Sequence, residues 1–428
     1  MRNKFPYFFA FLRVLGVLRG EGFFSPQKTM TTRTLNERYL IFTLAAVQFT
    51  YMMDFVVMMP LGPQLMRGLS IGAGEFSLLV SIYTLAAGLA SLLAGFYIDR
   101  FDRRTTLLCL YAGFLTATLL CGLAPNYEAL LVARACAGAI GGVMGSTIHS
   151  ILGDAIPDNR RGAATGIVMS AFSVAAITGV PAGLWLASAF DWHAPFIMLT
   201  ALSLVILGGV WRVVPALRGH LQPGAQKIHP LRQAQAVFSD ANHRSALTLA
   251  AAMDFGGFLV VPFIGAYMIG NVGLEEYELP FLYLFGGLTT VFTSRWIGRL
   301  ADRYGKKQVF TITVCIALIP LLTLTHLPPA PLWVAVCTMV AFMVFFSGRF
   351  VSAMALINSS AQPSLRGSFL SFNAAIQQFS LSVAALAGGY IIGTTESGAL
   401  ANFGAAGILS AAIAILSIAL AWRVKPVG

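Results

Sequence analysis

Apolar residues form long blocks along this chain, and charged residues or clusters of Gly and Pro separate the blocks. Each block can cross about 30 Å of hydrocarbon as a helix, because a helix rises 1.5 Å per residue and a crossing needs about 20 residues. The pattern predicts twelve membrane-spanning helices, at residues 38–60, 75–98, 105–124, 127–151, 162–188, 194–214, 244–270, 278–299, 307–326, 331–356, 367–393 and 401–422.

Composition agrees with this pattern. Hydrophobic residues make up 57% of the chain and charged residues only 11%, whereas about a quarter of a soluble domain is charged. The apolar runs lack the short alternating segments of an outer-membrane barrel, and a helix satisfies its own backbone hydrogen bonds in lipid. The sequence therefore predicts an all-α membrane protein embedded in a lipid bilayer.

Basic residues set the predicted orientation. The net charge is +11, but the basic residues are spread over short loops and form no patch for nucleic acid. With the N-terminus inside, Arg134, Arg295 and Arg349 lie within spans, and the other Lys and Arg are cytoplasmic except Arg67. The positive-inside rule thus predicts a multi-pass protein of the cell inner (plasma) membrane with both termini cytoplasmic.

The longest polar stretch between spans divides them six and six. We therefore predict a basic N-terminal extension at 1–36, a six-helix bundle at 37–214, a cytoplasmic linker at 215–243, and a second six-helix bundle with a short tail at 244–428.

Two segments outside the spans leave alternatives open. Residues 231–246 have loosely helical apolar spacing, so they form either a helix at the cytoplasmic surface or a solvated linker. The first 29 residues carry basic residues around an apolar run. They form a basic interfacial helix, or translation starts at Met30.

An internal repeat is the strongest signal in the chain. The string GFYIDRFDRR at residues 95–104 ends the second span, and GRLADRYGKK at residues 298–307 ends the eighth. Parallel repeats of six helices are typical of transporter halves. Two further pairs lie in the same register, Met53–Phe55 with Met253–Phe255, and Arg161–Gly162 with Arg366–Gly367.

These motifs resemble the major facilitator superfamily (MFS) over residues 37–423. The GxxxDRxxRR string is similar to the family's signature between helices 2 and 3, although Tyr97 replaces the usual Leu and Asp102 the usual Gly. Residues 134–142 resemble the RxxxG signature of helix 4. The resemblance implies the MFS fold, two pseudo-symmetric six-helix bundles.

Two other stretches indicate a branch of this family. Gly179, Pro181 and Gly183 in span 5 resemble the antiporter signature of drug:proton exporters, although Ala175 stands where a further Gly is often found. Residues 53–63 resemble the twelve-helix efflux branch that includes arabinose-efflux-like permeases.

The resemblance implies secondary active transport by alternating access, namely proton-coupled efflux (antiport) of a small molecule. The substrate site would lie at mid-membrane between the halves, lined by spans 1, 4, 7 and 10. We expect a functional monomer that uses the proton as coupling ion and needs no cofactor. The alternatives are a proton-independent facilitator or symporter of the same fold, and a non-transporting membrane sensor.

An enzyme is not predicted. No nucleophile and base recur at catalytic spacing, and the short motifs of nucleotide binding or metal-dependent hydrolysis are absent from the sequence. The five cysteines lie in apolar blocks without a CxxC, so they predict packing rather than a metal site or a disulfide framework.

The repeated loop is predicted to act as a cytoplasmic latch. Asp99 and Asp302 lie at helix ends beside basic clusters and can tie neighbouring helices together by charge pairs, and Asp154 is the nearest acidic partner for Arg100 or Arg103. The alternative is that these charges only set topology. The predicted latch residues are Gly95, Asp99, Arg100, Arg103, Arg104, Asp154, Gly298, Asp302, Arg303, Lys306 and Lys307.

Spans 1, 5 and 11 contain further candidate residues. Pro181 bends span 5, and Gly179 and Gly183 leave one smooth face for close helix contact. Polar and pliable residues suit a substrate cavity, although core packing or helix–helix hydrogen bonds also account for them. The cavity candidates are Gln48, Phe55, Met58, Asn373 and Gln377.

Buried charges give the mechanistic prediction, because a charged residue at a helix centre costs about 2.5–3.5 kcal/mol to insert. Asp54 and Arg134 lie at depths that agree within about one helical turn. We predict that Asp54 carries the proton and that Arg134 holds it ionised until a proton or substrate competes. Asp254 and Arg349 are predicted to be the substrate-side or structural counterpart. The alternative is two static ion pairs.

Overall fold

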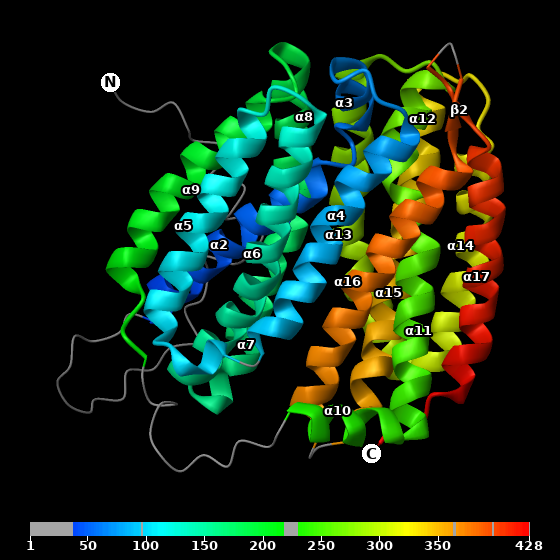
Figure 1. The fold of residues 1–428 in the computed structure, drawn as a ribbon. Coiled ribbons are helices and arrows are strands. Elements are labelled where there is room, and N and C mark those ends of the chain that lie inside the picture. The colour runs from blue at the N-terminus through cyan, green and yellow to red at the C-terminus, as the bar shows by residue number, and fades with distance from the viewer. Residues whose placement is uncertain (1–36, 96, 218–229, 363–364, 396–397, 428) are drawn as a thin grey trace. The chain divides into compact units, whose positions relative to one another are not determined.

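The structure is a computed structural model, and it describes residues 37–95, 97–217, 230–362, 365–395 and 398–427. The predicted extension at 1–36 therefore lies outside the described residues. The described chain is helical apart from two short antiparallel strands, β1 (Gly393–Thr394) and β2 (Leu400–Ala401). The all-α membrane fold predicted from the sequence is confirmed (Figure 1).

Helices of the first half follow the predicted blocks. Asp102 begins one of them, since its side chain accepts the Thr105 backbone N–H as an N-cap, and Asn126 begins the next in the same way. Such caps satisfy backbone donors that have no partner in the first turn. The helices are α2 (Glu37–Val57), α3 (Gly62–Gly68), α4 (Ala73–Ala94), η1 (Ile98–Arg100), α5 (Arg103–Gly122), α6 (Tyr127–Ala155), α7 (Asp158–Val174), η2 (Ala175–Gly179), α8 (Val180–Ala189) and α9 (Ala194–Val213).

The described part of the linker forms a helix, and Asp240 separates it from the second half. The Asp240 carboxylate accepts the backbone N–H groups of His243 and Asn242, which hold its pKa below the usual range. The helices are α10 (Pro230–Ser239), α11 (Ala241–Phe258), η4 (Val261–Phe263), α12 (Ile264–Gly270), η5 (Glu276–Glu278), α13 (Leu279–Tyr304), α14 (Lys306–Thr325), α15 (Leu332–Ser359), α16 (Arg366–Ile391) and α17 (Phe403–Arg423).

Eleven spans in the described residues have both the length and the hydropathy of a membrane crossing, with α7 to α8 and α11 to α12 each counted as one. The remaining predicted span corresponds to α13. With 26 residues it is about 39 Å long, which suffices to cross a bilayer. Thr and Ser residues and Arg295 lower its hydropathy.

Close packing of α6 on α4 depends on glycine. A Cβ atom added to Gly138 would collide with the Tyr83 backbone, and one added to Gly142 would lie 2.7 Å from the Cα of Ala87. Gly145, further along the same helix, has no neighbouring atom within 4 Å of such a Cβ. Small residues let membrane helices approach to this distance.

The variant Gly142→Ala is expected to be less stable by about 1–3 kcal/mol, because the added methyl group meets backbone that cannot yield by a rotamer change. The matched variant Gly145→Ala should be neutral or slightly stabilising, since alanine favours helix more than glycine. Thermal unfolding of both proteins in detergent checks this. Equal melting temperatures would contradict the proposed role of Gly142.

One end of the bundle, here called the hairpin end, carries α3, α12, β1 and β2 (Figure 1). Both halves join there in one buried apolar cluster, in which the rings of Phe76 and Phe263 lie 6.0 Å apart. Polar contacts across the halves reinforce it. Gln64 Nε2 donates to Glu276 at 2.7 Å, and Arg67 forms an ion pair with the same Glu276.

The opposite end, here called the linker end, carries α10 (Figure 1). Polar contacts there join helices of the same half. Arg160 pairs with Glu37 at 3.0 Å in the first half, and Gln362 Nε2 donates to Asp240 at 2.6 Å in the second. The halves also touch along α4 and α16, where Ser382 Oγ donates to the Ser81 carbonyl oxygen at 3.0 Å. The polar contacts named above thus join the halves at the hairpin end and not at the linker end, the arrangement expected of a bundle that is closed at the hairpin end.

Candidate functional site

A buried ion pair joins α2 to α6 in the first half. Arg134 Nη1 lies 2.9 Å from Asp54 Oδ2 and 3.3 Å from the Asp54 carbonyl oxygen. The Asp54 side chain is 0% exposed and that of Arg134 is 1% exposed. The structure thus brings together the two residues that were predicted to interact.

Other residues of the first half complete the surroundings of this pair. Thr118 Oγ1 on α5 donates to Asp54 Oδ1 at 3.5 Å, and the Arg134 guanidinium lies 4.2 Å from the centre of the Tyr83 ring on α4. A cation over an aromatic face is stabilised by the ring quadrupole. Four helices of one bundle therefore hold Asp54 in an enclosed, polar environment.

Span 5 passes beside this pair at its predicted antiporter motif. The helix widens to a π-turn at η2, and Gly179 and Gly183 face α2. A Cβ atom at Gly179 would lie 2.7 Å from Met53 Sδ, and one at Gly183 would lie 2.8 Å from Val57 Cγ2. The motif residues thus contact the neighbours of Asp54 in α2, and the small side chains make that contact possible.

The corresponding residues of the second half are arranged differently. Arg349 on α15 is 4% exposed, and its guanidinium lies 4.4 Å from the centre of the Phe346 ring. Asp254 on α11 lies next to Gln377 of α16, and its Oδ2 has no hydrogen-bond partner among the described residues.

Asp254 and Arg349 therefore do not form a direct ion pair within the described part of the chain. The helices that carry them are in contact, as the depth argument required. The two groups are nevertheless near each other, since a Cβ atom added to Gly257, one turn from Asp254 on α11, would lie 3.5 Å from Arg349 Nη2, while the guanidinium also stacks on Phe346. Asp254 keeps an oxygen that is available to another group.

Several buried side-chain polar atoms have no hydrogen-bond partner in the described part of the chain. Gln48 Oε1 on α2 and Asn373 Oδ1 on α16 lack a hydrogen bond among the described residues, as does Gln378 Oε1. Gln377 Nε2 donates only weakly, to Met354 Sδ at 3.5 Å. Unsatisfied buried acceptors cost about 1–3 kcal/mol each, so a bound molecule with hydrogen-bond donors would stabilise them.

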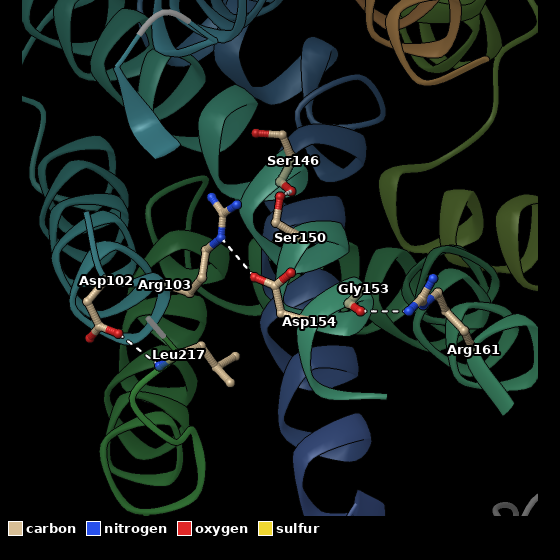
Figure 2. Close-up of polar contacts among 8 residues, drawn as sticks. All are labelled: Asp102, Arg103, Ser146, Ser150, Gly153, Asp154, Arg161 and Leu217. Atoms are coloured by element: carbon tan, nitrogen blue, oxygen red, sulfur yellow. Dashed lines mark hydrogen bonds and ion pairs between the residues drawn. The ribbon is translucent and has the colours of Figure 1, made fainter. Parts of the chain in front are cut away.

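At the linker end, the first copy of the repeated loop fastens helices of the first half (Figure 2). Arg103 Nε lies 3.2 Å from Asp154 Oδ2, which ties α5 to α6. Asp102 Oδ1 accepts the Leu217 backbone N–H at 2.8 Å. Asp102 thus caps α5 and holds the start of the linker, so an acidic residue has a structural function where the family usually has Gly.

The second copy makes a related contact with the last span. Lys307 Nζ donates to the Trp422 carbonyl oxygen of α17 at 3.1 Å. In the first half, Arg104 Nη2 likewise donates to the Trp211 carbonyl oxygen of α9 at 2.5 Å. Gly305 ends α13 at φ +96°, a conformation that favours glycine. Asp302 and Arg303 are exposed, and the Asp99 side chain lies outside what the structure describes.

A sequence profile of the Major Facilitator Superfamily matches residues 44–385 and, in a second match, residues 255–428. The chain belongs to the Major Facilitator Superfamily. It is accordingly a multi-pass transmembrane transporter and not an enzyme.

Individual relatives of this MFS transporter are distant. The uncharacterised MFS-type transporter YceJ of Bacillus subtilis is 27% identical over 401 residues, which cover 92% of this chain and 97% of YceJ. The crystal structure of a mutant of the nucleoside transporter NupG is similar to this structure with a TM-score of 0.73 at 14% sequence identity, and the match covers 90% of this chain and 100% of the NupG chain. The crystal structure of a bacterial homologue of the human lysosomal transporter Spinster, in an inward-facing and unoccupied conformation, has a TM-score of 0.69 to this structure at 14% sequence identity. That match covers 92% of this chain and 99% of the homologue.

Two predicted cavity residues of the MFS transporter take part in closing the hairpin end. Met58 is 0% exposed within the apolar cluster there, so in the described state it packs in the core. Phe55 stacks on Tyr83 at 5.5 Å and on Phe258 of the second half at 6.0 Å. Of the five cysteines, Cys121 is buried, and Cys109, Cys136, Cys315 and Cys337 lie on the outer surface of membrane spans.

Sequence reasoning missed three residues of this site. Tyr83 and Thr118 contact the ion pair from α4 and α5, and the Gln378 side chain lies beside that of Tyr51 in the first half. Tyr83 carries no local signal. Gln378 follows Gln377 directly, and two adjacent glutamines in an apolar span could have indicated a polar contact on each of two helix faces.

Proposed function

We propose that this MFS transporter exports a small molecule by exchange with protons. The supporting observation is the enclosed Asp54–Arg134 pair, in which Asp54 lies in α2 directly before the residues that close the hairpin end. A carboxylate in this place is shielded while the hairpin end is closed. It would meet water from that side once the end opens.

The proposed orientation places the linker end in the cytoplasm. Arg103, Arg104 and Arg160 lie at that end, whereas Arg67 lies at the hairpin end. The positive-inside rule supports this orientation. In it, the described state is closed toward the outside, and the similar Spinster homologue has a structure named inward-facing.

The proposed cycle assigns different tasks to the two carboxylates. Asp54 accepts a proton when the hairpin end opens, which removes its charge and frees Arg134 from its partner. Asp254, whose Oδ2 has no hydrogen-bond partner among the described residues, binds the substrate together with donor and acceptor groups of Gln377 and Asn373. Proton uptake and substrate release then both occur in the outward-open state, and proton release and substrate binding both occur in the inward-open state, as exchange by alternating access requires.

The direction of transport rests on the antiporter signature. Its π-turn and its glycines contact α2 on both sides of Asp54, so a change in the protonation of Asp54 can alter the packing of span 5. Coupling of this kind needs a structural element that can adopt two arrangements, and both the proton site and the substrate site must shift the balance between them. We propose that the η2 turn is this element.

The latch residues are proposed to steady the linker end of each half during the movement. Arg103 and Asp154 tie α5 to α6, and Lys307 ties α14 to α17. Because these contacts lie within single halves, they make each bundle more rigid and leave the halves free to move against each other.

The test begins with an expression host that lacks its own exporters, screened against drugs, sugars and metabolites for raised tolerance. The purified transporter is then placed in vesicles that contain a pH-sensitive dye. We expect substrate addition to move protons in the opposite direction. Substrate movement without proton movement would overturn proton coupling in favour of a facilitator, and proton movement in the same direction would indicate a symporter.

A further inference from the structure

A groove of about 560 Å³ lies on the surface of the first half, between α5 and α9. This volume is within the range of about 300–1,000 Å³ that is typical of ligand sites. Gly208 keeps it open, because a Cβ atom there would meet no atom within 4 Å. Its lining is apolar except for one thiol, and consists of Leu108, Cys109, Ala112, Leu204, Leu207, Gly208 and Trp211.

The groove lies on a surface that faces lipid. Both α5 and α9 are membrane spans, and Leu204 and Trp211 are 61% and 60% exposed. Trp211 is in the last turns of α9, where amphipathic aromatic rings favour the level of the lipid headgroups. In a bilayer such a groove fills with hydrocarbon, and the bilayer supplies acyl chains.

Two arginines lie where the groove reaches the linker end. Arg104 donates to the Trp211 carbonyl oxygen at 2.5 Å. Arg212 follows Trp211 and is exposed, without a hydrogen bond or an ion pair among the described residues. Asp102, an acidic residue of this loop, already accepts the Leu217 and Thr105 backbone N–H groups. Positive charge therefore dominates this end of the groove.

The second half offers an internal comparison, because Trp422 and Arg423 end α17 as Trp211 and Arg212 end α9. Trp422 Nε1 donates to Thr311 Oγ1 of α14 at 3.2 Å, which holds the ring against that helix. Leu108 stands at the corresponding place in α5 and offers no such acceptor. The indole of Trp211 is thus not fixed in this way.

We infer that the groove, with Arg104 and Arg212, binds one anionic phospholipid. Its acyl chain would lie along the groove and its phosphate would contact the two guanidinium groups. Packing of the chain gives little preference over the surrounding bilayer, since lipid tails are as apolar as leucine. Selectivity must therefore come from the headgroup, and planar guanidinium groups match phosphate geometry well.

Lipid retention measures this site directly and does not require a known substrate. The full-length transporter is reconstituted in phosphatidylethanolamine and phosphatidylglycerol mixed equally, and native mass spectrometry records which lipids stay bound. We expect one phosphatidylglycerol to be retained preferentially. Arg104→Gln and Arg212→Gln should each weaken that preference about five-fold, as expected for one basic residue at an anionic surface.

Shape is tested separately from charge. Gly208→Leu places a side chain in the groove at a position where a Cβ atom meets no atom within 4 Å, so the retained lipid should be lost. Val205→Phe adds bulk to the same helix outside the groove, at a residue that is 74% exposed, and should retain it. Arg423→Gln is the matched charge control in the second half.

Equal retention of the two lipids, or a loss of the same size in Arg423→Gln, would overturn the inference, and so would an undiminished lipid in Gly208→Leu. Arg212→Gln removes no contact within the described protein, so its melting temperature should stay unchanged and a failure to bind cannot be assigned to misfolding.

Discussion

Replacement of Arg134 by glutamine is expected to lower the free energy of unfolding by about 3–5 kcal/mol. The reason is that Asp54, which is 0% exposed, would keep a charge without its partner. Thr118 would remain, but a single hydrogen bond of 3.5 Å does not replace an ion pair of 2.9 Å. Unfolding by added sodium dodecyl sulfate, followed by circular dichroism, measures the change.

Two controls distinguish the stability contributed by the ion pair from the stability contributed by burying an arginine. The double variant Asp54→Asn with Arg134→Gln should regain most of the lost stability, since two amides can hydrogen-bond without a buried charge. Arg349→Gln removes an equally buried arginine that forms no ion pair with Asp254, so its cost should be smaller. If Arg134→Gln cost no more than Arg349→Gln, the pair would not be what stabilises the first half.

The number and placement of the helices could be predicted from the sequence, because in lipid a span must be long, apolar and helical. The repeat at residues 95–104 and 298–307 supplied the symmetry, and with it the equivalence of Asp54 and Asp254. Hydropathy alone is weakest for α13, where Arg295 and several hydroxyl residues lower the average. The six-plus-six pattern identifies this span where composition does not.

Contacts within the site were harder to predict. Depth in the membrane places Asp54 beside Arg134 and Asp254 near Arg349, but it does not predict that the first pair forms an ion pair of 2.9 Å while Arg349 stacks on Phe346. Depth fixes only one coordinate, and the rotation of each helix about its axis fixes the rest. That rotation follows from packing with other helices, as between Gly138 and the backbone of Tyr83, and no single segment encodes it.

Conformation was also out of reach of the sequence. Met58 is pliable and lies near Asp54, so its chemistry suits a cavity as well as a core. In the described state it is buried in the cluster that closes the hairpin end. A residue in a moving gate is packed in one state and accessible in another, and a sequence does not say which state a structure will show.

Asp54→Asn is expected to abolish uphill transport while it leaves exchange without a gradient intact. Asparagine keeps the size of the side chain and an oxygen that accepts from Arg134, but it cannot take up a proton. With one proton per substrate, a difference of one pH unit supports about ten-fold accumulation, since one unit corresponds to 1.36 kcal/mol. The variant should show no accumulation, measured in vesicles with the substrate from the export screen and an imposed pH gradient.

Asp254→Asn provides the contrast, because its carboxylate oxygen without a partner is assigned to the substrate. This variant should need a higher substrate concentration for half-maximal transport, yet it should still accumulate the substrate when a pH gradient is imposed. If Asp54→Asn also accumulated substrate, the proton would have to use another group, and Asp254 is the remaining acidic residue paired with Asp54 by the repeat. A loss of coupling in Asp54→Asn together with a loss of affinity in Asp254→Asn would place the proton step in the first half and the substrate step in the second, so that the two steps would be linked through the movement of the halves and not through competition for one carboxylate.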